Sequence, residues 1–129
     1  MAHVVVDGMN VIGSRPDGWW RDRDGAVRRL VHQLQQLART SGDAVTVVLD
    51  GRPLRDLPAG MHDGVEVIYA RRHGRNAADD RIVELLLEEV DEPAAVEVVT
   101  SDRDLADRAR RAGATVSGAG ALLRRLERA

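Results

Sequence analysis

The sequence contains no cysteine and no lysine. Without cysteine the chain has no disulfide, no thiolate zinc site and no cysteine nucleophile. Without lysine it has neither Schiff-base chemistry nor the lysine of a Walker-type phosphate loop. All 19 basic residues are therefore arginines, and these absences remove several large enzyme classes from consideration.

Long apolar runs are also missing. No stretch approaches the roughly 20 residues that span a bilayer, and the sequence leads directly into an expected strand, so we expect neither a signal peptide nor membrane contact. With 43% hydrophobic and 31% charged residues, the chain is expected to form one globular domain over residues 1–129, in the cytoplasm. The net charge of −2 argues against a general polyanion binder. The sequence leaves the oligomeric state, monomer or homodimer, open.

Apolar segments alternate along the chain with segments of helical periodicity. The expected strands are residues 3–7, 44–51, 64–70, 94–102 and 114–118, and the expected helices are residues 25–40, 76–90, 104–113 and 119–129. Strands that alternate with helices of this length indicate βαβ crossovers and an α/β fold whose mainly parallel sheet is covered on both faces. Residues 13–25 are expected to form a long loop.

Aspartates gather where the expected strands end and the following helices begin. These residues are Asp7, Asp50, Asp79, Asp80, Asp102 and Asp104. In open parallel sheets, ligands bind at the carboxyl ends of the strands. At least four carboxylates from separate segments are therefore expected to meet at the functional edge of the sheet.

Each of these aspartates alone has a structural explanation, because aspartate and asparagine are common turn and N-cap residues. Their convergence is harder to explain by capping, since unpaired carboxylates repel and raise one another's pKa. A divalent cation removes that cost, and oxygen-only ligation favours Mg²⁺ or Mn²⁺ over zinc. Gly8 is expected to allow an unusual backbone angle after Asp7. Asn10 is expected to orient a carboxylate or a water on the metal.

Four motifs of the chain, "VVDGMN", "VLDG", "AADDRIVELL" and "VVTSDRDLADRARRAGA", together resemble the NYN domain. This domain is a branch of the PIN-like ribonucleases, and the resemblance is strongest to its bacterial YacP-like members. It implies a Rossmann-like α/β/α sandwich and a metal-dependent endoribonuclease that acts on RNA. By motif position, Asp7, Asp79 and Asp102 resemble the acidic core, which also suggests them as ligands of Mg²⁺ or Mn²⁺. Asn10, Asp80 and Asp104 resemble further catalytic members, while the role of Asp50 is open.

Hydrolysis by such a site is expected to leave a 5′-phosphate and a 3′-hydroxyl, because metal-activated water rather than the 2′-hydroxyl attacks. RNA preference then has to come from binding. Arginine is suited to bidentate phosphate contacts. The arginines expected to bind RNA phosphates are Arg52, Arg71, Arg72, Arg75 and Arg103. A solvated loop, or ion pairs to nearby aspartates, is the alternative.

The sequence excludes two other functional classes and leaves two interpretations open. A receiver-type phosphoacceptor needs a lysine, and a dinucleotide-binding enzyme needs a glycine pattern that "DGMNVIG" lacks. Trp19 and Trp20 either stack on RNA bases or anchor their loop to the core, and neighbouring tryptophans often split, one inward and one outward. The main rival is a non-catalytic RNA-binding or regulatory NYN module that keeps the fold and a metal site.

Overall fold

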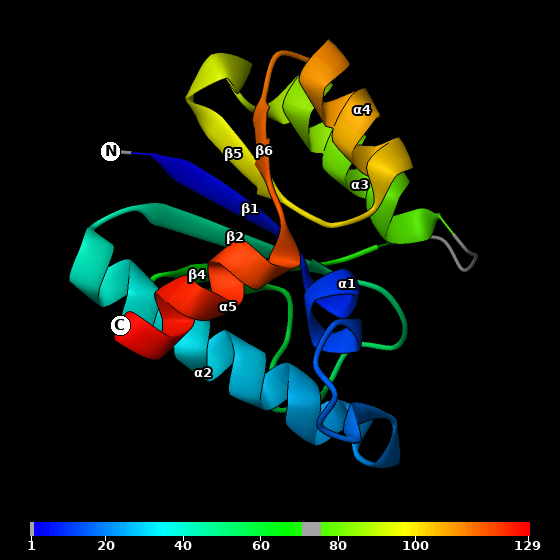
Figure 1. Ribbon diagram of the computed structural model, residues 1–129, viewed down its shortest axis with the longest axis vertical. Coiled ribbons are helices and arrows are strands. Elements are labelled where there is room, and N and C mark those ends of the chain that lie inside the picture. The colour runs from blue at the N-terminus through cyan, green and yellow to red at the C-terminus, as the bar shows by residue number, and fades with distance from the viewer. Residues whose placement is uncertain (1, 71–75) are drawn as a thin grey trace.

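A six-stranded sheet forms the centre of the protein (Figure 1), in a computed structural model that describes residues 2–70 and 76–129. Its strands are β1 (His3–Asp7), β2 (Ala44–Leu49), β3 (Gly60–His62), β4 (Val65–Tyr69), β5 (Val96–Val99) and β6 (Thr115–Ser117). The spatial order is β3-β4-β2-β1-β5-β6, and every neighbouring pair is parallel except β3 and β4. The expected α/β fold with a mainly parallel sheet is confirmed.

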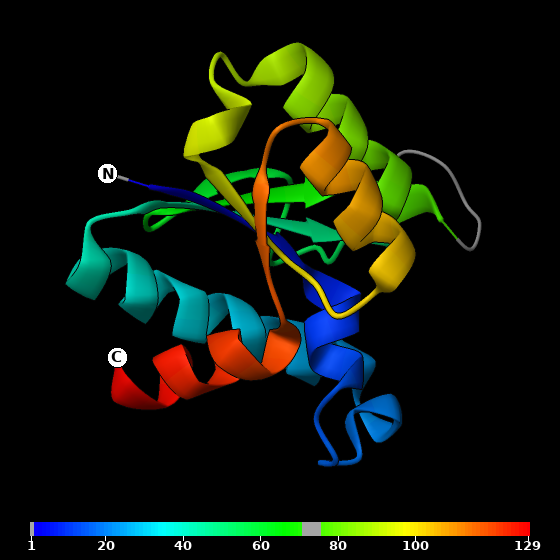
Figure 2. The same ribbon diagram turned by 45° about the horizontal axis from the view of Figure 1, so that its top comes forward.

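Helices cover both faces of the sheet. They are α1 (Gly8–Gly13), α2 (Arg23–Ser41), α3 (Ala77–Glu84), α4 (Arg103–Arg111) and α5 (Ala119–Arg128), with shorter helical segments at Trp19–Arg21, Leu85–Glu89 and Pro93–Ala95. Figures 1 and 2 show α1, α2 and α5 on one face and α3 with α4 on the other. None of the helices in the described part of the chain has the length and apolar character needed to cross a bilayer.

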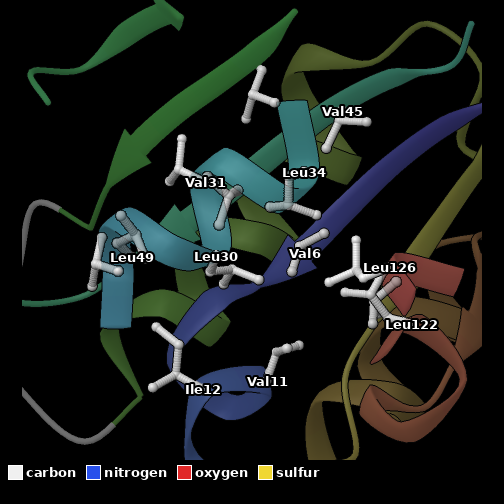
Figure 3. Close-up of a cluster of buried hydrophobic side chains, with 14 of the residues drawn as sticks. Val6, Val11, Ile12, Leu30, Val31, Leu34, Val45, Leu49, Leu122 and Leu126 are labelled. Atoms are coloured by element: carbon white, nitrogen blue, oxygen red, sulfur yellow. The ribbon is translucent and has the colours of Figure 1, made fainter. Parts of the chain in front are cut away.

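The valine-rich strands are buried on both faces because each face meets a helical layer. In β1, Val4 and Val6 belong to the core under α2 and α5, whereas Val5 belongs to the core under α3 and α4. This alternation follows from the two-residue period of a strand. Figure 3 shows the first core, where Val6 lies among leucines of α2 and α5. Burying each such leucine contributes roughly 2 kcal/mol, which holds the central strands and their ends in place.

The order of the strands creates a switch point beside β1. The chain adds β2 and then β4 on one side of β1, and later places β5 and β6 on the other side. The segment after β1 therefore covers one face of the sheet and the segment after β5 covers the other, and open sheets bind ligands in a crevice at such a point. In Figure 1 this edge lies at the right, where α1 and the beginnings of α3 and α4 come together. The fold thus places a switch point, and with it the expected ligand crevice between β1 and β5, at the edge where the aspartates were expected.

Two elements differ from the sequence-based expectation. Residues after Asp7, for which no helix was expected, form the short helix α1, and β3 forms an antiparallel hairpin with β4. The hairpin turns at Asp63 and Gly64, whose φ angles are both positive, at 48° and 89°. Asp-Gly is the preferred pair for such a tight turn. This dipeptide was the signal from which the hairpin could have been predicted.

Candidate active site

Asp7 and Thr100 meet across the switch point. Asp7 is the last residue of β1 and only 4% exposed, and its Oδ2 accepts a 2.9 Å hydrogen bond from the Thr100 hydroxyl. The same hydroxyl oxygen accepts a 3.1 Å hydrogen bond from the backbone N–H of Asp102. Thr100, itself buried, thereby joins the two aspartates. Sequence reasoning missed this residue, although it directly follows the buried run of β5.

Asp102 lies beyond the strand that was expected to end with it. The strand β5 ends at Val99, and Asp102 is the N-cap of α4. Its Oδ1 accepts hydrogen bonds from the backbone N–H groups of Asp104 and Leu105, at 2.9 and 3.4 Å. Among the described residues, no hydrogen bond to its Oδ2 is found. The capping explanation is therefore correct for Oδ1, whereas Oδ2 takes no part in the cap.

Asn10 holds the loop that carries Asp102. Its side-chain Oδ1 accepts a 2.9 Å hydrogen bond from the backbone N–H of Ser101, so this side chain fixes the backbone between β5 and α4, while the backbone of Asn10 hydrogen-bonds to Asp7. The Ser101 hydroxyl oxygen in turn accepts the N–H of Ala119 at the start of α5, at 3.0 Å. These two bonds connect α1, the loop and α5 around the crevice.

The adjacent aspartates of α3 occupy different environments. Asp79 is buried, at 8% exposure, whereas Asp80 is exposed and forms a 3.0 Å ion pair with Arg108 of α4. Asp104, in the first turn of α4, is exposed. Asp79 is therefore the inward-facing member of the pair, whereas Asp80 joins α3 to α4.

Electrostatic interactions show that these carboxylates share one region. Burial raises the pKa of Asp7 to about 6, with smaller contributions from the charges of Asp102 and Asp50, against hydrogen bonds from Thr100 and the Asn10 backbone. Burial also raises the pKa of Asp79 to about 6, helped by the charges of Asp7 and Asp102. The charges of carboxylates from β1, α3 and the start of α4 thus influence one another.

The donor set suits a hard divalent cation. It consists of carboxylate oxygens alone, and its mutual repulsion is the penalty that a cation relieves. Within residues 2–70 and 76–129, no three acidic or histidine side chains lie close enough together to hold a metal ion as they stand. The chemistry of the residues fits Mg²⁺ or Mn²⁺, and the structure does not itself define a coordination geometry.

The remaining site predictions have mixed outcomes. Asp50 forms a 2.8 Å ion pair with Arg23 of α2, so the arginine side chain offsets its negative charge. Arg52 is exposed in the loop after β2, and Arg103 is exposed at the first position of α4. Arg103 borders a cavity of about 420 Å³ that Asp102 also lines. The predicted RNA-binding residues Arg71, Arg72 and Arg75 lie outside the described residues.

Gly8 is required for close packing rather than for an unusual backbone angle. It is not among the glycines with positive φ, and it is buried as the first residue of α1. A Cβ at this position would lie 2.6 Å from Leu49 Cδ2 and 3.0 Å from the Val48 carbonyl oxygen. The expected unusual backbone angle at Gly8 was therefore wrong. A glycine is needed here because α1 packs closely against β2.

Replacing Gly8 by alanine should lower the free energy of unfolding by about 1–3 kcal/mol, because the added methyl group displaces the end of β2. Gly13, at the other end of α1, is the matched control, since a Cβ there meets no atom within 4 Å. Gly13→Ala should be neutral or stabilising by up to about 1 kcal/mol. Urea unfolding of both variants measures the difference. Equal stabilities would show that α1 does not pack against β2 as described.

The fold, the aspartates near the switch point of its sheet and a matching family model together define an α/β protein of the PIN-like, nuclease-type class. A family model for the YacP-like NYN domain matches residues 4–129. The chain belongs to this family of YacP-like NYN domains, which confirms the resemblance drawn from the motifs.

Solved structures agree with this assignment. The chain is similar to Rae1 (YacP) from Bacillus subtilis, with 28% identity and a TM-score of 0.73 over 99% of this chain and 75% of that one. The W164L mutant of the same Bacillus protein gives 27% identity and a TM-score of 0.77 over 98% of this chain and 74% of the other. No curated protein matches the sequence.

Proposed function

We propose that the protein is a divalent-metal-dependent endoribonuclease that hydrolyses RNA phosphodiester bonds at the crevice between β1 and β5. The observation that supports it most strongly is the buried Asp7, which is joined through Thr100 to Asp102 and whose charge raises the pKa of Asp79. A protein gains nothing in stability by gathering such carboxylates, so their arrangement suits a bound cation and an anionic substrate. Membership of the NYN family adds independent support for a nuclease.

In this proposal Asp7, Asp79 and Asp102 would hold Mg²⁺ or Mn²⁺. When bound, such an ion would help a water molecule to attack the phosphodiester and would stabilise the negative charge on the leaving oxygen. The surrounding residues keep these carboxylates in position. Thr100 fixes Oδ2 of Asp7, and Asn10 fixes the loop before Asp102.

Asp80 and Asp104, the two exposed aspartates, are proposed to support the site without binding the metal. Asp80 joins α3 to α4 through Arg108, which keeps the helix bearing Asp79 against the helix capped by Asp102. Asp104 adds negative charge near Asp79. Arg52 and Arg103 are proposed to contact the phosphates of RNA, since both are exposed near the crevice. A cytoplasmic location and a single domain over residues 1–129 stay predictions from the sequence.

An end-labelled RNA incubated with the purified protein and Mn²⁺ tests the proposal. We expect internal cleavage with a 5′-phosphate and a 3′-hydroxyl on the products, because water is the nucleophile. Asp79→Asn, purified in the same way, is the control for contaminating nucleases and should not cleave. Products with 2′,3′-cyclic phosphate ends would contradict the mechanism. RNA binding without any cleavage would instead favour the non-catalytic RNA-binding module.

A further inference from the structure

Two ion pairs attach the loop after β2 to the beginning of α2. The loop comprises residues 50–57. Arg23 contacts Asp50 at 2.8 Å and also donates to its backbone carbonyl at 3.0 Å. Arg28 donates to both carboxylate oxygens of Asp56, at 2.8 and 3.0 Å. Bidentate pairs of this kind fix orientation as well as position.

Tyr69 of β4 anchors the same loop from the sheet. Its hydroxyl donates a 2.6 Å hydrogen bond to the carbonyl of Leu57 and accepts a 3.3 Å hydrogen bond from the N–H of Leu54. Leu57 is buried in the core on the α2 side of the sheet. The loop is thus held at several points, and its other side chains are presented from a fixed backbone.

Arg52 and Arg55 are the side chains so presented. Both are exposed, and neither has an acidic partner within the described part of the chain. They line a groove of about 530 Å³ between residues 52–56 and the first two turns of α2, which we call the arginine groove. Four arginines and two aspartates line it. Since Arg28 compensates Asp56 and Arg23 compensates Asp50, Arg52 and Arg55 are opposed among the lining residues by Asp24 alone, and the groove keeps an excess of positive charge.

The arginine groove begins beside the acidic crevice. The strand β2, which leads into the loop, pairs with β1 so that Val48 lies opposite Asp7. Asp50, two residues further on, is close enough for its charge to raise the pKa of Asp7. If the phosphate to be cleaved lies at Asp7, neighbouring phosphates of the same strand would therefore lie in the arginine groove.

An exposed tryptophan lies just before the same end of α2. Trp20 precedes Arg23 by three residues and is 62% exposed, whereas Trp19 packs against the core. The two rings meet edge to face, with centroids 6.1 Å apart and an interplanar angle of 86°. The guanidinium carbon of Arg21 lies 6.0 Å from the Trp20 ring centroid. Trp19 thus anchors the turn and leaves a face of Trp20 in solvent.

We propose that the arginine groove and Trp20 bind a single RNA strand on one side of the cleaved bond, a proposal that rests on the proposed function. Arg52 and Arg55 contact backbone phosphates, and Trp20 stacks on an unpaired base. A charged groove that follows the backbone, combined with an exposed aromatic ring, is the arrangement by which proteins bind single strands. Phosphate contacts fix the register of the strand, and stacking requires that the base be free of a duplex.

Binding is measured with the Asp7→Asn chain, which is not expected to cleave, and a fluorescein-labelled 12-nucleotide single-stranded RNA. Adding Arg52→Ala and Arg55→Ala should weaken binding at least about tenfold. The slope of log affinity against log salt should fall by about 1.4, because each single-strand phosphate contact contributes roughly 0.7. The control adds Arg39→Ala and Arg128→Ala, which remove two exposed arginines from the last turns of α2 and α5. The control should leave the salt dependence unchanged.

Trp20 is tested in the same background. Trp20→Ala should weaken binding by about 5- to 150-fold, as expected for the loss of one stacked base, without altering the salt slope. Trp20→Phe should restore part of the affinity, because its ring can still stack. A 12-base-pair RNA duplex should bind less tightly than the single strand and should not respond to Trp20→Ala.

The results separate this proposal from the proposed function. If the groove variant loses affinity and salt dependence while the unaltered chain cleaves no RNA, the RNA surface is correct and the nuclease proposal is wrong. If the unaltered chain cleaves RNA but the groove variant and its control bind equally well, the groove proposal is overturned. A salt slope that falls equally in both double variants would also overturn it, since the charge effect would then be general.

Discussion

Asp7→Asn is expected to lower the rate of RNA cleavage by about a thousandfold or more while making the metal-free protein more stable. The rate falls because a cation at a hydrolytic centre contributes several kcal/mol of charge stabilisation, and each 1.36 kcal/mol corresponds to a factor of ten. The fold persists because the amide oxygen of asparagine can accept the hydrogen bond that Thr100 donates to Asp7.

The gain in stability should depend on pH in a defined direction. Because the pKa of Asp7 is raised in the folded state to about 6 from 3.8, the unfolded chain ionises first as the pH rises. The folded state therefore loses stability between about pH 4 and pH 6, and two pKa units correspond to about 3 kcal/mol. Asp7→Asn should match the original chain near pH 4 and exceed its unfolding free energy by roughly 2–3 kcal/mol at pH 7.

Urea unfolding of both chains, from pH 4 to pH 7 with a chelator present, measures this difference. Comparing the two chains removes the contribution of other titrating groups, such as Asp56, whose pKa the hydrogen-bonded Arg28 lowers. A constant difference across this range would show that Asp7 does not ionise late in the folded protein. Asp102→Asn is a useful companion, because asparagine keeps the N-cap of α4 while removing a charge. It should also lose cleavage and remain folded.

Removing divalent metal is expected to abolish cleavage, and adding Mn²⁺ or Mg²⁺ should restore it. The same ion should stabilise the fold, because a ligand that binds only the native state adds about 3 kcal/mol at a hundred times its dissociation constant. Stabilisation is expected to be largest above pH 6, where Asp7 and Asp79 are ionised.

Cleavage assays and melting curves with EDTA, followed by excess Mn²⁺, test this expectation. Asp7→Asn serves as the matched control and should show little stabilisation by Mn²⁺. Cleavage that continues in excess chelator would contradict a metal-dependent mechanism. Equal stabilisation of both chains by Mn²⁺ would show that the ion binds away from Asp7.

Much of the site was predictable because it depends on strand ends, which the apolar runs of the sequence reveal. Asp7 ends β1 and Asp79 lies in the first turn of α3, as the sequence indicated. What the sequence did not reveal is which atom contacts which. The position of Thr100 between Asp7 and Asp102 depends on β5 lying beside β1, and the order of strands cannot be read from periodicity.

Other features were not predictable because they depend on tertiary contacts. Gly8 looked like a residue chosen for its backbone freedom, whereas the approach of α1 to β2 is what requires it. The hydrogen bond from the Ser101 N–H to Asn10 Oδ1 was not foreseen, because it joins residues that are 91 positions apart in the sequence. The helix α1 was missed because six residues are too few to show a helical period.

The arrangement of the sheet also limits how much strand edge is open to pairing with another molecule. The outermost strands, β3 and β6, are three residues long each, so either edge offers only a few unpaired backbone groups to another molecule. The longer valine-rich segments of β1 and β2, which have the composition of aggregation-prone sequences, pair on both sides in the middle of the sheet. Exposure of these segments requires the sheet itself to open, so resistance to aggregation is tied to the stability of the whole fold.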